Sequence, residues 1–118
     1  MRRDWLLYVD DILESIEILE GIRSDISTLE QFSGDRRLVL ACERCLEIIG
    51  EAAKHLPREI REKHSAVPWK HIIGMRDILA HGYFSLSHAI IWDTMNNHLG
   101  ILKAAAEEML ASSGEEES

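Results

Sequence analysis

Apolar residues recur at intervals of three and four along this chain, and that spacing restricts the fold more than any other feature. The pattern covers four long segments, at about residues 4–22, 36–56, 68–82 and 85–111. Such spacing places apolar side chains on one face of an α-helix, whereas a half-buried strand requires strict alternation. No segment rich in valine, isoleucine and threonine alternates in that way. The sequence therefore predicts an all-α fold.

The connections between these segments are short and contain residues that start helices. Asp35 stands where it can cap the helix that follows it. Pro57 and Pro68 each suit the first turn of a helix. Helices of this length with short connections form bundles. We expect an antiparallel helical bundle of four longer helices plus short helical segments, built as one domain over residues 1–111 and followed by a disordered acidic tail over residues 112–118.

Gly50 lies in the middle of the second predicted helix, where glycine costs about 1 kcal/mol relative to alanine. This cost requires a compensating reason elsewhere in the molecule. Close approach of a second helix is the simplest reason, and a tight contact between two subunits is another.

Cys42 and Cys45 are the two cysteines of the chain and lie about one turn apart on the second predicted helix. A structural zinc site needs four ligands, and no second ligand pair follows them. We interpret both as small core residues of a reduced, cytoplasmic protein, and we expect neither a metal nor a cofactor. No run of about 18 apolar residues occurs, so we expect no membrane span. Acidic residues inside the first apolar segment argue against a signal peptide.

The formal charge of the chain is −8 at pH 7, but this charge is unevenly distributed. Residues 54–81 contain six lysines and arginines against three acidic residues, so this stretch is cationic within an acidic chain. A cationic surface can bind nucleic-acid phosphates, although basic residues on a helix are often simply solvated. Lys54, Arg58 and Lys70 are weak candidates for contacts with an RNA backbone.

The stretch RDILAHGYF places four polar side chains within eight residues, namely Arg76, Asp77, His81 and Tyr83. In one interpretation it is an ordinary helix end, because histidine interacts well with the negative helix terminus and Gly82 can stop the helix. In the other it is a site, because Asp77 and His81 share one helix face and arginine suits a phosphate. Arginine and histidine together fit metal-free cleavage of RNA, in which the ribose 2′-hydroxyl is the nucleophile.

The side chains of Arg76 and His81 do not meet automatically on one helix. Their separation of five residues corresponds to about 140° around an ideal helix axis. They converge only if the helix distorts at its end, or if a second copy of the chain completes the site.

The motif matches R-x-x-x-x-H-x-Y, which is typical of HEPN-domain proteins of the HepT kind. The stretches ERCLEIIGEAAKHLP and VPWKHIIGMRDILAHGYF resemble two helices of that family, and the likeness extends over about residues 5–110. This resemblance implies a small helical bundle that forms a homodimer, with the motifs of two protomers facing one cleft. It also implies a metal-independent endoribonuclease toxin, with Arg76 and His81 as the catalytic pair and Asp77 assisting.

The resemblance further implies a partner protein. Tyr83 matches the tyrosine that a minimal nucleotidyltransferase antitoxin modifies with AMP groups, and this modification would block RNA by bulk and negative charge. The alternative is a non-catalytic helical module that pairs with a nucleotidyltransferase or binds nucleotide. Cleavage of labelled RNA by the purified protein in excess chelator would distinguish the two.

We expect structural roles for Trp69 and for the histidines outside the motif. Trp69, directly after Pro68, is expected to pack at the helix start rather than to stack on a base. The other histidines show no ligand spacing, and we interpret each as a surface or core residue: His55, His64, His71, His88 and His98.

Overall fold

The computed structural model describes the backbone of residues 4–81 and 84–117, and the side chains within 4–79 and 88–112. These residues form seven helices and no strand, which confirms the predicted all-α fold. In chain order the helices are α1 (Leu6–Ser24), α2 (Leu29–Ser33), α3 (Arg36–Lys54), α4 (Arg58–Lys63), α5 (Trp69–His81), α6 (Phe84–Asn97) and α7 (Leu99–Glu117).

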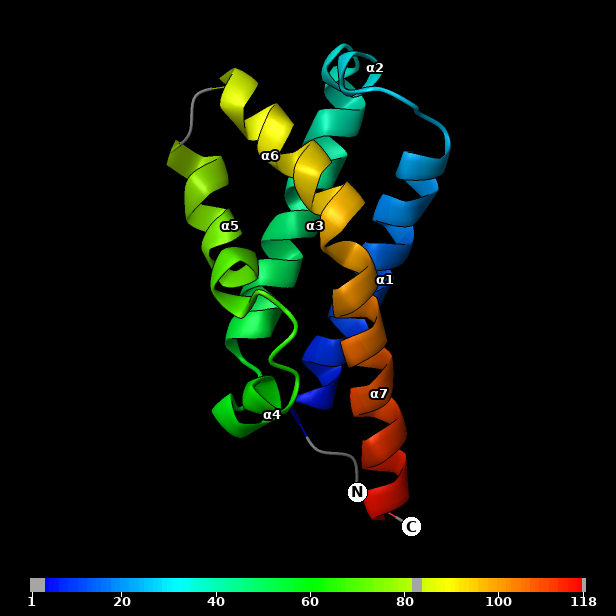
Figure 1. The fold of residues 1–118 in the computed structure, drawn as a ribbon, viewed down its shortest axis with the longest axis vertical. Coiled ribbons are helices and arrows are strands. Elements are labelled where there is room, and N and C mark those ends of the chain that lie inside the picture. Colours follow the sequence, from blue (N-terminus) through cyan, green and yellow to red (C-terminus); the bar gives the residue numbers. More distant parts are fainter. Residues whose placement is uncertain (1–3, 82–83, 118) are drawn as a thin grey trace.

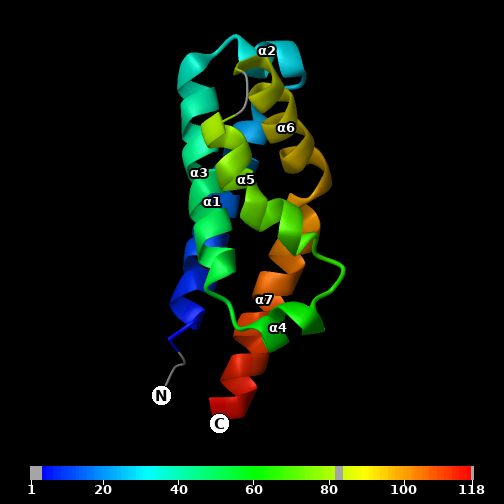
Figure 2. The same cartoon turned by 90° about the vertical axis from the view of Figure 1, so that its left-hand side faces the viewer.

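The long helices alternate in direction along the longest axis of the molecule (Figure 1). α1 and α5 run one way, and α3 and the consecutive pair α6 and α7 run the other way. α3 is central because it packs against both α1 and α5, while α7 covers another side of α1. α2 lies at one end of the bundle and α4 toward the other (Figure 2). This arrangement is the expected antiparallel bundle.

Each long helix contributes apolar residues to one continuous core, as the three-four spacing predicts. Local capping also agrees with the sequence, because one carboxylate oxygen of Asp35 accepts the backbone N–H groups of Arg37 and Leu38. The largest fully buried side chains come from α1, α2, α3, α5, α6 and α7, and include Phe32, Leu6, Ile12, Ile16, Leu19, Leu46, Ile49, Met75, Ile91 and Leu102.

Gly50 lies at a close approach of α3 and α5. A Cβ atom built at this position would lie 3.0 Å from the carbonyl oxygen of Ile72 and 3.5 Å from that of Ile73. Both atoms belong to the α5 backbone, which cannot move aside as a flexible side chain would. Of the two explanations for this glycine, close helix packing within one chain is therefore the one that the structure supports.

The two cysteines are buried and free, as their interpretation as core residues predicts. The Sγ atom of Cys42 lies 3.8 Å from the sulfur of Met95 on α6. Burial raises the pKa of the Cys42 thiol to about 12, with smaller contributions from Cys45 and Glu43. A thiol with so high a pKa stays protonated at neutral pH, so it is neither a ready nucleophile nor a ready metal ligand.

Trp69 joins the start of α5 to the end of α4. Its indole Nε1–H lies 3.0 Å from the carbonyl oxygens of both Arg61 and His64. The tryptophan therefore ties the start of α5 to backbone carbonyl groups at the end of α4, and its expected structural role is confirmed. No helix in the described part of the chain combines the length and the apolar character needed to cross a membrane.

Several helix boundaries differ from the sequence predictions. The single helix expected over residues 85–111 is two helices, α6 and α7, with His98 between them. The interruption is local, because the N–H of His98 still donates to Thr94 and its carbonyl accepts from Leu102. α5 begins one residue after Pro68, whose carbonyl accepts the bond from the N–H of Ile72. α7 ends at Glu117 rather than near position 111, and the separate tail over 112–118 stays a prediction.

Candidate active site

α5 carries three of the four motif residues, and two of these three have described side chains, both exposed. Arg76 and Asp77 are both exposed on its surface. His81 is the last helical residue of α5, so its backbone is described, whereas its side chain lies outside the described residues. Tyr83 also lies outside them. The structure therefore reports the surroundings of Arg76 and leaves the geometry between Arg76 and His81 as a prediction.

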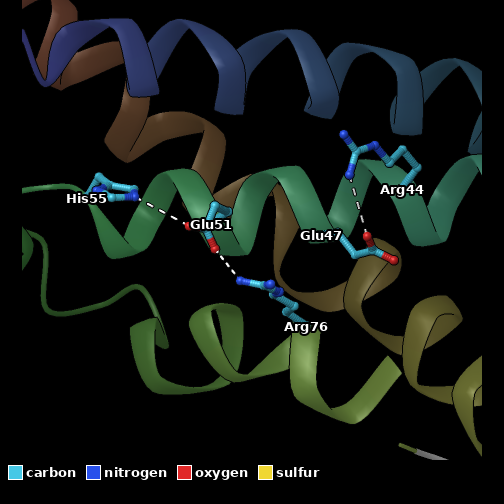
Figure 3. A network of polar contacts seen from close by, with 5 residues as sticks. All are labelled: Arg44, Glu47, Glu51, His55 and Arg76. Carbon is cyan, nitrogen blue, oxygen red and sulfur yellow. Dashed lines mark hydrogen bonds and ion pairs between the residues drawn. The ribbon is translucent and has the colours of Figure 1, made fainter. Parts of the chain in front are cut away.

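The guanidinium group of Arg76 points across to α3 and contacts a carboxylate there (Figure 3). Its Nη1 atom donates a hydrogen bond to Oε2 of Glu51 at 2.7 Å, a short distance typical of a charged pair. The side chain of Arg76 is still 59% exposed, so a ligand can reach it.

The same carboxylate has a second neighbour on its own helix. Oε1 of Glu51 lies 3.4 Å from Nε2 of His55, which caps the C-terminal end of α3. The His55 ring in turn stacks on Tyr8 of α1, with ring centroids 4.7 Å apart and planes 13° apart. Tyr8, His55, Glu51 and Arg76 therefore form a chain of contacts that joins α1, α3 and α5.

The side chains of Tyr8, Glu51 and Arg76 line a shallow groove of about 330 Å³ between the three helices. Arg44 on α3 also lines the groove, and its Nη1 lies 3.6 Å from Oε2 of Glu47. Side chains of both charges thus line its wall: Arg44, Glu47, Glu51 and Arg76, with Asp11 on the α1 side.

Burial opposes ionisation of the Glu51 carboxyl group, but the effects of neighbouring groups outweigh it. The hydrogen bond from His55 and the positive charges of Arg76 and Lys54 favour the carboxylate, so the pKa of Glu51 lies below its usual value. The carboxylate is therefore ionised at neutral pH and forms a full ion pair with the guanidinium of Arg76.

Sequence reasoning did not identify Glu51 as a member of the site. A usable signal was present, because Gly50 indicated close approach of a second helix and Glu51 is its direct neighbour. A polar residue beside such a contact can reach across to the approaching helix. What was missing was the knowledge that α5 is that helix, and that Arg76 lies one turn beyond Ile72 on the same face.

The three weak candidates for RNA contacts lie on three successive helices. Lys54 ends α3, Arg58 begins α4, and Lys70 lies in the first turn of α5; all three are exposed. Arg58 already donates its Nε–H to Glu62 at 3.0 Å, so its charge is partly balanced. Lys54 and Lys70 therefore remain the better candidates.

Two histidines that are distant in sequence form a cluster on another side of α5. The rings of His71 and His98 have centroids 4.9 Å apart, and Nε2 of His71 lies 3.2 Å from the hydroxyl of the buried Thr94. His98 also lies 3.8 Å from Asp93. Burial and the nearby His98 lower the pKa of His71, an effect that Asp93 partly offsets. These are structural contacts of the kind expected for the histidines outside the motif.

The described residues contain no group of three or more His, Cys, Asp and Glu side chains that could hold a metal ion. What the exposed groups can do is bind an anion. The guanidinium of Arg76 uses one N–H on Glu51, and a phosphate needs only two of the five that arginine has.

Comparison with known proteins gives a consistent result. A family model described as "Ribonuclease HepT-like" matches residues 12–109. A protein of Caldanaerobacter subterraneus named "Putative RNase" is 48% identical over 103 residues, which cover 87% of this chain and 91% of that protein. A "Probable ribonuclease HepT" of Thermococcus cleftensis is 36% identical over 109 residues, which cover 92% of this chain and 98% of that protein. The search of solved structures found no match.

Proposed function

Because the chain belongs to the HepT-like family of ribonucleases, we propose that it is the toxin of a toxin–antitoxin pair and cleaves RNA internally without a metal ion. In this proposal Arg76 and His81 act on the scissile phosphodiester, and Asp77 assists His81. A second protomer completes the site, and a nucleotidyltransferase antitoxin keeps it inactive. The family match over residues 12–109 supports the proposal.

The observation that carries the proposal is the environment of Arg76. This arginine stands on the exposed side of α5 at the edge of a groove, where it donates a hydrogen bond to Glu51 and keeps 59% of its side chain exposed. The same helix ends at His81, so one continuous element carries both residues of the motif. A fixed and accessible guanidinium is what recognition of a phosphodiester requires.

The reaction needs no external nucleophile, because RNA carries a 2′-hydroxyl next to each phosphate. The imidazole of His81 takes the proton from this hydroxyl, and the oxygen attacks the phosphorus. The bond from phosphorus to the 5′-oxygen then breaks, and that oxygen takes a proton from a second imidazole. Arg76 stabilises the additional negative charge of the phosphorane. The products carry a 2′,3′-cyclic phosphate and a 5′-hydroxyl.

A homodimer supplies what one chain lacks in this scheme. Arg76 and His81 are five residues apart on α5, which corresponds to about 140° around the helix axis. Two facing copies of α5 provide one imidazole as base, another as acid, and two guanidinium groups around one phosphate. Light scattering should therefore report a dimer under assay conditions. A monomer that cleaves at the full rate would contradict the composite site.

Cleavage of labelled RNA in excess chelator is the central test. The purified protein should produce fragments that end in a 2′,3′-cyclic phosphate, and Arg76→Ala and His81→Ala should each reduce the rate by at least about a hundredfold. Circular dichroism should show that both variants keep the helical fold. If RNA stays intact over a range of sequences, the alternative holds, namely a non-catalytic module that binds a nucleotidyltransferase or nucleotide.

The proposed antitoxin acts through Tyr83. Incubation with a minimal nucleotidyltransferase and ATP should add mass to the protein in units of AMP, because the enzyme transfers AMP to the phenol oxygen and releases pyrophosphate. Tyr83→Phe removes the acceptor oxygen and should gain no mass by intact-protein mass spectrometry. An equal gain by this variant would place the modification elsewhere.

Lys70 tests the weaker assignment of RNA contacts. Reversal of its charge in Lys70→Glu should weaken RNA binding most at low salt, since the contact is with phosphate and is screened as salt rises. Arg58→Glu is a matched comparison, because the charge of Arg58 is already partly balanced by Glu62 and its reversal should matter less. Unchanged binding of Lys70→Glu at low salt would remove Lys70 from the interface.

A further inference from the structure

Glu51 lies outside the sequence motif, on α3, and its carboxylate accepts a hydrogen bond from the motif residue Arg76 on α5. Its contact with Arg76 spans 25 positions in the sequence and joins α3 to α5. The two oxygens of the carboxylate have different neighbours: Oε2 accepts from Nη1 of Arg76, and Oε1 faces Nε2 of His55 (Figure 3).

We infer that Glu51 is a positioning residue for Arg76, whose carboxylate fixes the guanidinium at the edge of the groove in an orientation ready to bind a phosphodiester. This inference rests on the proposed function, because it assumes that Arg76 contacts the RNA. It adds a residue from α3 to the motif of α5, and it gives that residue a role other than contact with substrate.

The contacts of the Glu51 carboxylate indicate that it assists phosphate binding by Arg76 rather than competing with it. A carboxylate that competes with phosphate for arginine would present both oxygens to the guanidinium as a two-bond fork. Here one oxygen faces His55, and the contact with Arg76 is through the other. Since the bond uses one N–H of five, the guanidinium keeps enough donors to bind a phosphate by a fork of its own.

The support for Glu51 extends beyond an ordinary surface ion pair. Exposed pairs fix little, because both side chains remain free to move. In this case His55 contacts the second oxygen and is itself stacked on Tyr8 of α1. The adjacent Gly50 lets the α5 backbone approach α3, which sets the distance that the two side chains have to span. The position of Arg76 is therefore determined by three helices rather than by α5 alone.

Glu51→Ala and Glu51→Gln test this role in the full-length protein under saturating and limiting RNA. Loss of the anchor in Glu51→Ala should reduce kcat about tenfold with a smaller change in KM, because a misplaced group is felt most in the transition state. Glu51→Gln keeps an acceptor oxygen at the same place and should restore most of the rate. A rate above that of the wild type in either variant would mean that the carboxylate competes with phosphate, and would overturn the inference.

Glu47→Ala is the matched control. Glu47 lies about one turn before Glu51 on α3 and lines the same groove, but its partner is Arg44. Its removal changes the charge of the groove by the same amount without releasing Arg76, so kcat should stay within about twofold of the wild type. An equal loss of kcat in Glu47→Ala and Glu51→Ala would show that groove charge, not positioning, controls the rate.

A double-mutant cycle separates this inference from the proposed function. If Glu51 acts only through Arg76, adding Glu51→Ala to Arg76→Ala should cause no further loss of cleavage. If Arg76→Ala cleaves RNA as fast as the wild type, the proposed function fails. If Arg76→Ala is inactive while Glu51→Ala keeps the full kcat, only the role of Glu51 fails. Should Glu51→Ala not fold, the comparison of Glu51→Gln with the wild type still decides whether the carboxylate helps or hinders.

Discussion

On one side of α5 the helix backbone touches its neighbour, whereas on another side the connection runs through polar side chains. Toward α3, a Cβ at Gly50 would lie 3.0 Å from the carbonyl oxygen of Ile72. Toward α6, the imidazole of His71 reaches the hydroxyl of Thr94 at 3.2 Å and the ring of His98 at 4.9 Å. The first contact depends on shape, and the second depends on hydrogen bonding and on the protonation of histidine.

This difference explains where the candidate site lies. Arg76 is four residues after Ile72, so it stands on the face of α5 that packs by shape against α3. A contact between backbones cannot relax by rotation of a side chain, which makes that face the more rigid of the two. A group that has to meet a phosphate within a fraction of an ångström benefits from such a support.

The shape-determined side should respond most strongly to mutation. Gly50→Val introduces a branched side chain against the α5 backbone, so the helices have to separate. We expect the free energy of unfolding to fall by about 2 kcal/mol, as in other overpacked cores, with a parallel loss of RNA cleavage. Urea denaturation monitored by circular dichroism measures the first effect.

Gly21→Ala is the control for Gly50→Val. Gly21 also lies within a helix, but a Cβ there would meet nothing within 4 Å. Alanine should therefore raise the free energy of unfolding by up to about 1 kcal/mol through helix propensity alone. If Gly50→Val proved as stable as Gly21→Ala, the contrast between the two sides of α5 would be wrong.

Mutations on the hydrogen-bonded side of α5, which faces α6, should change stability less. Thr94→Val keeps the shape of a buried side chain but removes the hydroxyl that pairs with His71, and it should lower the free energy of unfolding by about 1 kcal/mol. Thr94→Ser keeps the hydroxyl and serves as the comparison. A Thr94→Val protein with wild-type stability would indicate that this side is also held by packing alone.

The smallest expected effect is the contribution of His71, on the α6 side of α5, to the pH dependence of protein stability. The pKa of His71 is lower in the folded protein than in the unfolded chain, so the unfolded chain binds more protons between those two pKa values. Stability should therefore fall as the pH drops through the ordinary histidine pKa toward the lowered one. His71→Gln should show a shallower fall in thermal denaturation between pH 7 and 5, and an unchanged slope would remove His71 as its cause.

The sequence predicted the helices and their buried faces closely, and its errors are at helix ends and at the interruption between α6 and α7. Capping by Asp35, the core role of Cys42 and the structural role of Trp69 were all readable from local pattern. The interruption at His98 was not, because no proline marks it and the hydrogen bonds continue through it. A helix that bends without breaking its backbone bonds leaves no local signal in the sequence.

Only part of the candidate site could be predicted from the sequence. Arg76, Asp77, His81 and Tyr83 are close in sequence, so their motif is visible without a structure. Glu51 belongs to a different helix and carries no mark of its partner. Local pattern can indicate that a residue is polar on a helix face, but it cannot indicate which residue of another helix it meets.

The sequence by itself determined which segments become helices, which face of each is buried, and which helix carries the arginine and the histidine of the motif. Those properties follow from side-chain spacing and capping, which act within a few residues. Only the tertiary structure decided that Gly50 faces Ile72 and that Glu51 therefore reaches Arg76. The axial position and rotation of one helix against another depend on how all of their side chains pack together, and no single segment encodes that result.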